Sequence, residues 1–205
     1  MNITENIVAN GSLTVRQGIF GAMNKDQLIS DLAAVVPIPL DSFRVWDAFK
    51  TPLGTAAADD AGMTAGAFAT GCPYIHSLEL NAAGSVTQYA RVLVTLPISY
   101  VAGQEVKVNL AGGMLTSVAS VAATVDVEAY KTGRDALITG SDLCTTSATT
   151  INSLTFAEVP FTLTATGLSP GDMLDIRITF ASNSATASSH FAAIAAAELQ
   201  ITSKG

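Results

Sequence analysis

Charged residues are scarce in this 205-residue chain, in which Asp, Glu, Lys and Arg together make up 13% of the sequence. The ten basic residues form no cluster, and the formal net charge is −7. Because nucleic-acid binding relies on clustered Lys and Arg side chains that contact phosphates, we expect no nucleic-acid partner. The first 50 residues carry four basic and five acidic groups, so most of the negative charge lies in the rest of the chain.

Cysteine and histidine are nearly absent. Cys72 and Cys144 are too few for a disulfide scaffold, although a single bridge between them is compatible with the sequence. Only His76 and His190 could act as the base of a Ser/His/Asp hydrolase, and the elbow-like Gly62–Gly66 segment has Thr where the nucleophilic Ser belongs. The sequence also has no phosphate loop, dinucleotide fingerprint or cysteine pair at metal spacing. We therefore expect neither enzymatic activity nor a cofactor.

Long apolar segments are missing too. The chain has no run of about 18 apolar residues and does not open on a basic and then apolar leader, so we expect no transmembrane helix, no membrane partner and no secretory signal. We expect the protein to be made and assembled in a cytoplasm. Many residues are small and uncharged, which favours surfaces that contact other proteins; a soluble sandwich with a weakly charged surface is the alternative.

The clearest pattern is an alternation of apolar and polar residues. Between Leu168 and Phe180, a turn at Pro170 and Gly171 leads into a segment in which every second residue is large and apolar. Val106 to Leu110 repeats the pattern. A period of two is typical of strands with one buried face, so the body is predicted to be antiparallel β-structure.

Eight segments have strand character, separated in most cases by Gly, Pro, Asn or Ser. Uneven spacing between strands suits two sheets of Greek-key type better than an up-and-down barrel. We therefore predict an all-β protein, an eight-stranded antiparallel jelly-roll sandwich over residues 43–205, with a long loop over residues 52–73. The predicted strands are Phe43–Trp46, Ile75–Leu80, Val86–Leu96, Glu105–Leu110, Thr124–Lys131, Phe156–Ala165, Met173–Phe180 and Phe191–Thr202.

Residues 1–42 differ from this body and are predicted to form an N-terminal arm. Asn10-Gly11 indicates a short hairpin, and Asn24 can cap a short helix. Leu28, Ile29 and Leu32 line one face of that helix, which Pro37 and Pro39 end. Since the arm has too few large apolar residues for its own core, it either anchors the protein to a partner or sister subunit or covers one open end of the sandwich.

Aromatic residues make up only 6% of the chain, fewer than a carbohydrate-binding sandwich usually presents. Trp46 is the only tryptophan and is interpreted as a core or hinge residue. Tyr130 is out of phase with the apolar residues of its strand and is predicted to be exposed. Asp59 and Asp60 are not followed by further carboxylates, so they are interpreted as a solvated turn and not as a calcium site.

Several short motifs in residues 45–202 resemble those of virion-associated proteins of tailed bacteriophages. They are Trp46-Asp47, Asp59-Asp60, Tyr89-Ala90-Arg91, Tyr100-Val101-Ala102-Gly103, Ala111-Gly112-Gly113-Met114, Val125-Asp126-Val127-Glu128 and Pro170-Gly171-Asp172. The plan is similar to that of jelly-roll decoration, or cement, proteins of phage heads.

This resemblance implies a structural protein, without catalytic residues, on the capsid exterior of the virion. It implies a homotrimer that binds the major capsid protein and braces the lattice. Small uncharged residues around Ala119, Ala148 and Ala185 would allow the close subunit approach that a trimer needs. The expected capsid or subunit contacts are Leu28, Ile29, Leu32, Pro37 and Pro39. The alternative hypothesis is a head fibre or a host-surface carbohydrate-binding module, with Trp46 or Tyr130 contacting the glycan.

Overall fold

Ten β-strands and one short 3-10 helix make up the regular structure of the described residues in the computed structural model. The structure describes residues 32–116, 118, 121–132, 138, 140–186 and 189–204. The elements are β1 (Leu32–Pro37), η2 (Leu40–Ser42), β2 (Gly62–Thr64), β3 (Tyr74–His76), β4 (Gly84–Thr95), β5 (Val106–Leu115), β6 (Val121–Thr132), β7 (Thr149–Thr150), β8 (Ala157–Leu163), β9 (Met173–Ser184) and β10 (Phe191–Ser203).

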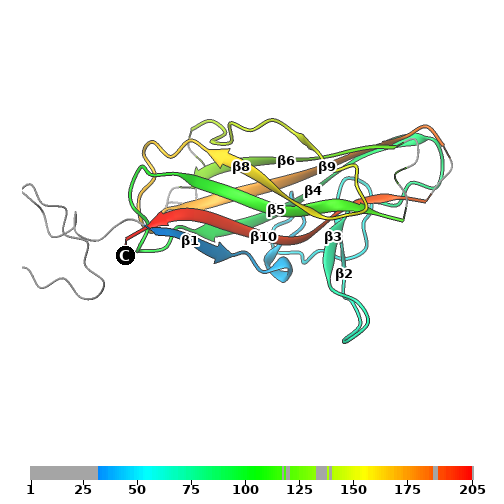
Figure 1. The fold of residues 1–205 in the computed structure, drawn as a ribbon, viewed down its shortest axis with the longest axis horizontal. Coiled ribbons are helices and arrows are strands. Elements are labelled where there is room, and N and C mark those ends of the chain that lie inside the picture. Colours follow the sequence, from blue (N-terminus) through cyan, green and yellow to red (C-terminus); the bar gives the residue numbers. More distant parts are fainter. Residues whose placement is uncertain are drawn as a thin grey trace, which may run out of the picture. The chain divides into compact units, whose positions relative to one another are not determined.

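The strands form two antiparallel sheets that pack face to face as a sandwich (Figure 1). One sheet has six strands in the order β2-β3-β10-β5-β8, with β1 also paired to β10, and the other has the order β4-β9-β6-β7. The prediction of an all-β antiparallel sandwich is therefore confirmed. The described strands number ten and not the eight that were predicted.

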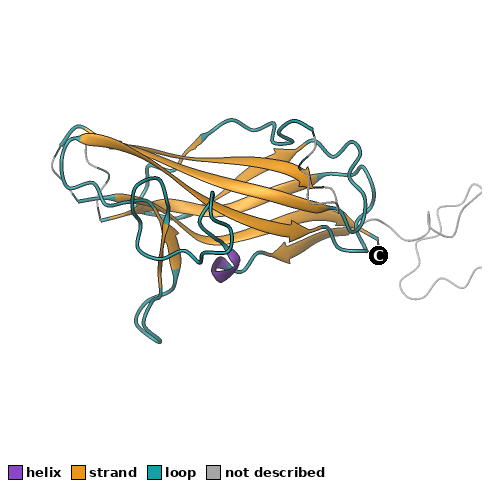
Figure 2. Ribbon diagram, turned by 180° about the vertical axis from the view of Figure 1, so that it is seen from behind, coloured by secondary structure: helices purple, strands orange, loops and turns teal. Residues whose placement is uncertain are grey.

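The order of the strands is jelly-roll-like. Successive strands β4, β5 and β6 alternate between the sheets, and the arrays β1-β10-β5-β8 and β4-β9-β6-β7 face each other. The two additional strands, β2 and β3, extend the six-stranded sheet beside the first part of β10, while β1 pairs with its last part. The loop between β2 and β3 projects beyond the two layers (Figure 2).

The core lies between the sheets and follows the alternation in the sequence. In β9 the inward-facing Leu174, Ile176, Ile178 and Phe180 are all fully buried. Val106, Val108 and Leu110 of β5 are equally buried in the opposite sheet. The strand register predicted from the period of two is thus confirmed for both segments.

Residues 43–46 were predicted to be the first strand of the body, and this was wrong. Arg44 makes only isolated bridges, to Pro52 and to Arg91 of β4. The segment follows the tight turn of η2 and pairs with β4 at a single bridge, between Arg44 and Arg91, so it forms no longer ladder. The predicted loop over residues 52–73 is also not entirely irregular, because residues 62–64 form β2 and pair with β3.

Most of the predicted arm, including the Asn10-Gly11 hairpin, lies outside the described residues. The prediction that Leu32 belongs to a helix was wrong, because Leu32 begins β1 and lies opposite Ser203 of β10. The apolar segment that follows, with two adjacent valines, favours a strand when a sheet edge is available. Residues 32–42 thus contribute β1 and η2 to the sandwich. The described helix is far too short and polar to span a bilayer.

Both cysteines are free thiols, but their surroundings differ. Cys72 is exposed, whereas burial raises the pKa of the Cys144 thiol to about 11, with a smaller contribution from nearby carboxylates, chiefly Asp142. Because the thiolate is the reactive form, about one Cys144 thiol in a thousand is ionised at pH 8. We expect iodoacetamide at pH 8 to modify Cys72 at least tenfold faster than Cys144, as measured by peptide mass spectrometry. In denaturant the two rates should converge; equal rates in the folded protein would contradict this assignment.

Candidate functional site

The outer face of the four-stranded sheet carries a set of polar and aromatic side chains that the strand register aligns in rows. Arg91 of β4, Arg177 of β9 and Glu128 of β6 lie in one row across the sheet. Asp175 of β9 and Tyr130 of β6 lie in the next row. Each of these residues alternates with the buried residues of its strand, so all five point away from the core.

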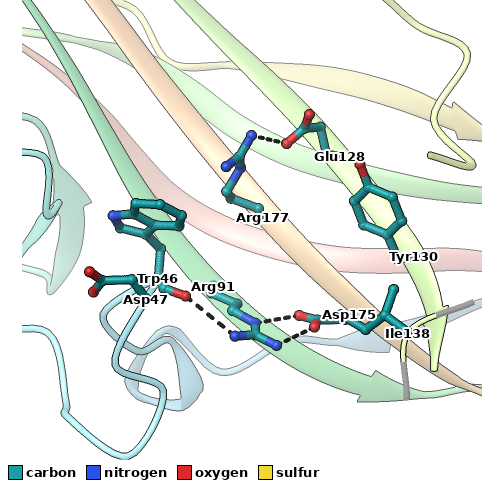
Figure 3. A pocket seen from close by; sticks show the side chains of 8 residues that line it. All are labelled: Trp46, Asp47, Arg91, Glu128, Tyr130, Ile138, Asp175 and Arg177. Atoms are coloured by element: carbon teal, nitrogen blue, oxygen red, sulfur yellow. Dashed lines mark hydrogen bonds and ion pairs between the residues drawn. The ribbon is translucent and has the colours of Figure 1, made fainter. Parts of the chain in front are cut away.

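Two ion pairs organise this face (Figure 3). Arg91 and Arg177 are direct cross-strand partners, an arrangement in which like charges repel. Arg91 is held by Asp175, to which its Nε donates a hydrogen bond of 2.7 Å and its Nη2 a second bond. That hydrogen bond raises the pKa of Arg91. Arg177 pairs with Glu128, so each guanidinium has its own carboxylate.

Trp46 forms a wall of the site, and four contacts fix it. Its indole Nε1 donates a hydrogen bond of 3.2 Å to Asp59 Oδ2, and its ring lies 5.1 Å from that of Tyr89 at an angle of 53°. The guanidinium of Arg177 lies 5.5 Å from the Trp46 ring and 4.8 Å from the Tyr89 ring, within the range of cation–π contacts. Arg91 Nη1 also donates to the backbone oxygen of Trp46 at 3.4 Å.

The segment that carries Trp46 is attached to the edge of β4 by its backbone. Arg44 and Arg91 exchange backbone hydrogen bonds of 2.8 and 3.0 Å, and the amide of Tyr89 donates to the Asp59 oxygen at 2.8 Å. Burial and the negative charges of Asp47 and Asp59 raise the pKa of Asp60 in the same loop. Among the described residues no group of three or more His, Cys, Asp or Glu side chains is placed to hold a metal ion.

These side chains enclose an open hollow of about 300 Å³, which we call the aromatic groove. Trp46 and Tyr130 are both half-buried, so each also presents part of its ring to solvent. Burial and the nearby Glu128 and Asp142 raise the pKa of Tyr130. Figure 3 shows the lining residues, which are Trp46, Asp47, Arg91, Glu128, Tyr130, Ile138, Asp175 and Arg177.

The contact residues predicted from the sequence lie elsewhere. Leu28 and Ile29 fall outside the described residues. Leu32 is 56% exposed at the start of β1, and Pro37 and Pro39 are exposed at its end and just beyond it. Leu32 and Pro37 belong to the six-stranded sheet and Pro39 precedes η2, whereas the aromatic groove lies on the four-stranded sheet.

Sequence reasoning had selected Trp46 and Tyr130 as the aromatic residues that could contact a glycan, and the structure brings both to one groove. It missed the charged residues between them. Arg91, Glu128 and Asp175 do stand out of phase with the buried residues of their strands, which marks them as outward-facing. Nothing in the local pattern shows that three strands so distant in the sequence place them side by side.

The fold and the groove together define the chain as an antiparallel β-sandwich with a ligand-sized groove on the outer face of its four-stranded sheet. No protein-family model and no curated protein matches the sequence.

Among solved structures, the chain is similar to the CBM22-1 xylan-binding domain from Paenibacillus barcinonensis Xyn10C, with 6% identity, a TM-score of 0.43 and coverage of 86% of this chain and 99% of that one. The CBM22-1-GH10 modules of Clostridium thermocellum xylanase 10B, complexed with xylohexaose, match with 12% identity and a TM-score of 0.40 over 83% of this chain and 28% of that one. A chain of infectious bursal disease virus Gx strain matches with 11% identity and a TM-score of 0.31 over 95% of this chain and 54% of that one. Similarities of this size carry no argument about function.

Proposed function

We propose that the protein is a structural component of a tailed-phage virion, a decoration protein that binds the outer surface of the capsid and stabilises the lattice. The observation that supports this best is the composition of β1. Its sequence, LAAVVP, has no charged residue, and Leu32 and Val35 are 56% and 55% exposed.

An uncharged, exposed edge strand makes a protein that acts alone prone to unwanted association with other chains. Unpaired backbone groups at a sheet edge recruit other chains, and soluble proteins usually protect such edges with charges, bulges or a covering segment. Among the described strands, β1 pairs with β10 alone, so its other edge is available. We infer that the major capsid protein covers this edge in the virion.

The distribution of charge fits the same function. The negative charge lies mainly beyond residue 50, in the sandwich, whereas β1 is uncharged. Like charges on neighbouring copies would keep the projecting bodies soluble and apart, while the uncharged edge faces the capsid. Three copies around a local threefold axis would repeat one modest contact with closed symmetry.

Capsid binding tests the role of β1. We expect Leu32→Lys/Val35→Lys to reduce co-sedimentation with empty capsids of the parent phage at least tenfold, because two charges would be buried at the contact. Leu154→Lys is the matched control, since Leu154 is also an exposed apolar residue, at 55%, but follows Ser153, whose backbone oxygen accepts a hydrogen bond from Met114 near the other end of β10 from the Leu32 pairing. Binding by the double variant at the level of the unmodified protein would overturn the assignment of β1.

Cryo-electron microscopy of the virion tests the function as a whole. A decoration protein is expected as regular density at every local threefold axis of the capsid. A few copies at the vertices or on the tail would instead indicate a head fibre or a receptor-binding module. Light scattering tests the trimer, for which three times the 21.0 kDa chain mass is expected.

A further inference from the structure

The capsid contact proposed above does not use the aromatic groove, which lies on the other sheet. We propose that the aromatic groove binds a neutral saccharide. The observation behind this is that two partly exposed aromatic rings, Trp46 and Tyr130, flank a hollow whose floor is made of ion-paired Arg and carboxylate side chains.

The aromatic side chains supply the apolar part of saccharide recognition. A sugar ring has one face of C–H groups, which packs against the flat face of an aromatic ring, while its hydroxyls point outward in the plane of the sugar. Trp46 is held rigidly by Asp59 and Tyr89, so little conformational freedom is lost when a ligand packs against it. Half-buried aromatic side chains of this kind are frequent at binding surfaces.

The charged side chains supply the polar part, and their pairing selects for a neutral ligand. Arg91 is neutralised by Asp175, and Arg177 by Glu128. A carboxylate or phosphate group on the ligand would have to displace one of these carboxylates, and it would also face Asp47 at the rim. Hydroxyl groups require no such displacement, because they can donate to the remaining lone pairs of the carboxylates.

One buried polar atom in the groove has no hydrogen-bond partner among the residues that the structure describes. The Nε of Arg177 is inaccessible to solvent and makes no hydrogen bond, although its guanidinium contacts the rings of Trp46 and Tyr89 and pairs with Glu128. Buried donors of this kind are rare in folded proteins. A small rotation of the Arg177 side chain on ligand binding would bring this donor within reach of a hydroxyl oxygen.

The size of the groove limits the ligand. A hollow of about 300 Å³ is at the small end of the range for small-molecule sites. It suits a short saccharide segment and is too small for a folded domain. Because the groove is open, a longer polysaccharide could continue beyond it.

Trp46 provides a direct readout, since it is the only tryptophan of the chain and lines the groove. We expect neutral oligosaccharides of glucose, galactose, mannose or xylose to change the tryptophan fluorescence of the full-length protein saturably. Oligogalacturonate, which is anionic, should cause no saturable change. If no neutral oligosaccharide changes the emission, or if the anionic one binds more tightly, the proposal is wrong.

A pair of matched variants locates the binding. Tyr130→Ala should weaken the affinity at least tenfold, because it removes one aromatic side of the groove. Tyr74→Ala makes the same change on β3 of the other sheet and should bind as the unmodified protein does. If the two variants bind the saccharide with equal affinity, the aromatic groove is not the binding site. Thermal unfolding should show both variants folded, and Tyr130→Ala should still co-sediment with capsids, which separates a failure of this proposal from a failure of the decoration function.

Discussion

Replacing Ile178 by Asp is expected to abolish soluble folding. Ile178 is fully buried in the middle of β9, and its neighbours across the sheet, Ala90 on β4 and Val127 on β6, are buried as well. A carboxyl group at this position would have no water and no hydrogen-bond partner, and the isoleucine side chain would be lost as well, so the combined cost is expected to be a large part of the about 5–15 kcal/mol that stabilises a typical domain. The measurement is the soluble fraction after expression and centrifugation.

Two further variants make this prediction quantitative. Ile178→Ala leaves a cavity without a charge, so we expect a soluble protein whose free energy of unfolding is lower by about 2–5 kcal/mol. Arg177→Ala, one residue earlier on the outward face, should cost about 1 kcal/mol or less, because its ion pair with Glu128 is partly exposed. Arg177→Ala proving the more damaging change would mean that β9 is shifted by one residue.

Arg91→Met is expected to lower the free energy of unfolding by about 3 kcal/mol in urea denaturation. Methionine keeps much of the apolar stem but removes the charge that compensates Asp175, whose side chain is only 5% exposed. A buried carboxylate without a counter-ion is unfavourable, and the substitution also breaks the hydrogen bond to the Trp46 backbone.

A second substitution, Asp175→Asn, tests whether the uncompensated charge of Asp175 causes this loss of stability. In the Arg91→Met background it removes the uncompensated charge, so we expect it to restore part of the lost stability. Arg177→Met is the matched control, since Arg177 lies directly opposite Arg91 but pairs with Glu128, which is 30% exposed. If Arg177→Met lowers the free energy of unfolding as much as Arg91→Met does, the burial of Asp175 does not explain the effect of Arg91→Met.

The sequence predicts the central strands well because their burial is one-sided and regular. Ile176 and Ile178 alternate with Asp175 and Arg177, and this pattern alone is sufficient to assign the inward face of β9. The strand β1 was not predicted, because its segment does not show this regular alternation. Leu28, Ile29 and Leu32 have helical spacing, and only the presence of β10 beside residues 32–37 makes a strand the better structure.

The groove could be predicted only in part. Trp46 and Tyr130 are noticeable because aromatic residues are few and Tyr130 is out of phase with its buried neighbours. The pair formed by Arg91 and Asp175 joins residues 84 positions apart. Such a contact depends on the register between two long strands, and a local pattern contains no information about that register. The position of Trp46 likewise depends on backbone bonds from a loop to the edge of β4.

The position of β9 and β10 in the two sheets has a consequence for how the protein is made. β9 lies between β4 and β6, and β10 lies between β5 and the pair β1 and β3, yet these two strands are made after all the other described strands. Until they emerge, the earlier strands of both sheets lack the neighbour that joins them, so the sandwich can close only after β9 and β10 have been made. Pairings between strands so distant along the chain form slowly. Until they form, the unpaired edges of the earlier strands can associate with other chains and aggregate. Deletion of residues 191–203 should therefore be far more harmful to the yield of folded protein than a deletion of similar length in a surface loop, since it would remove all of β10 from the centre of its sheet.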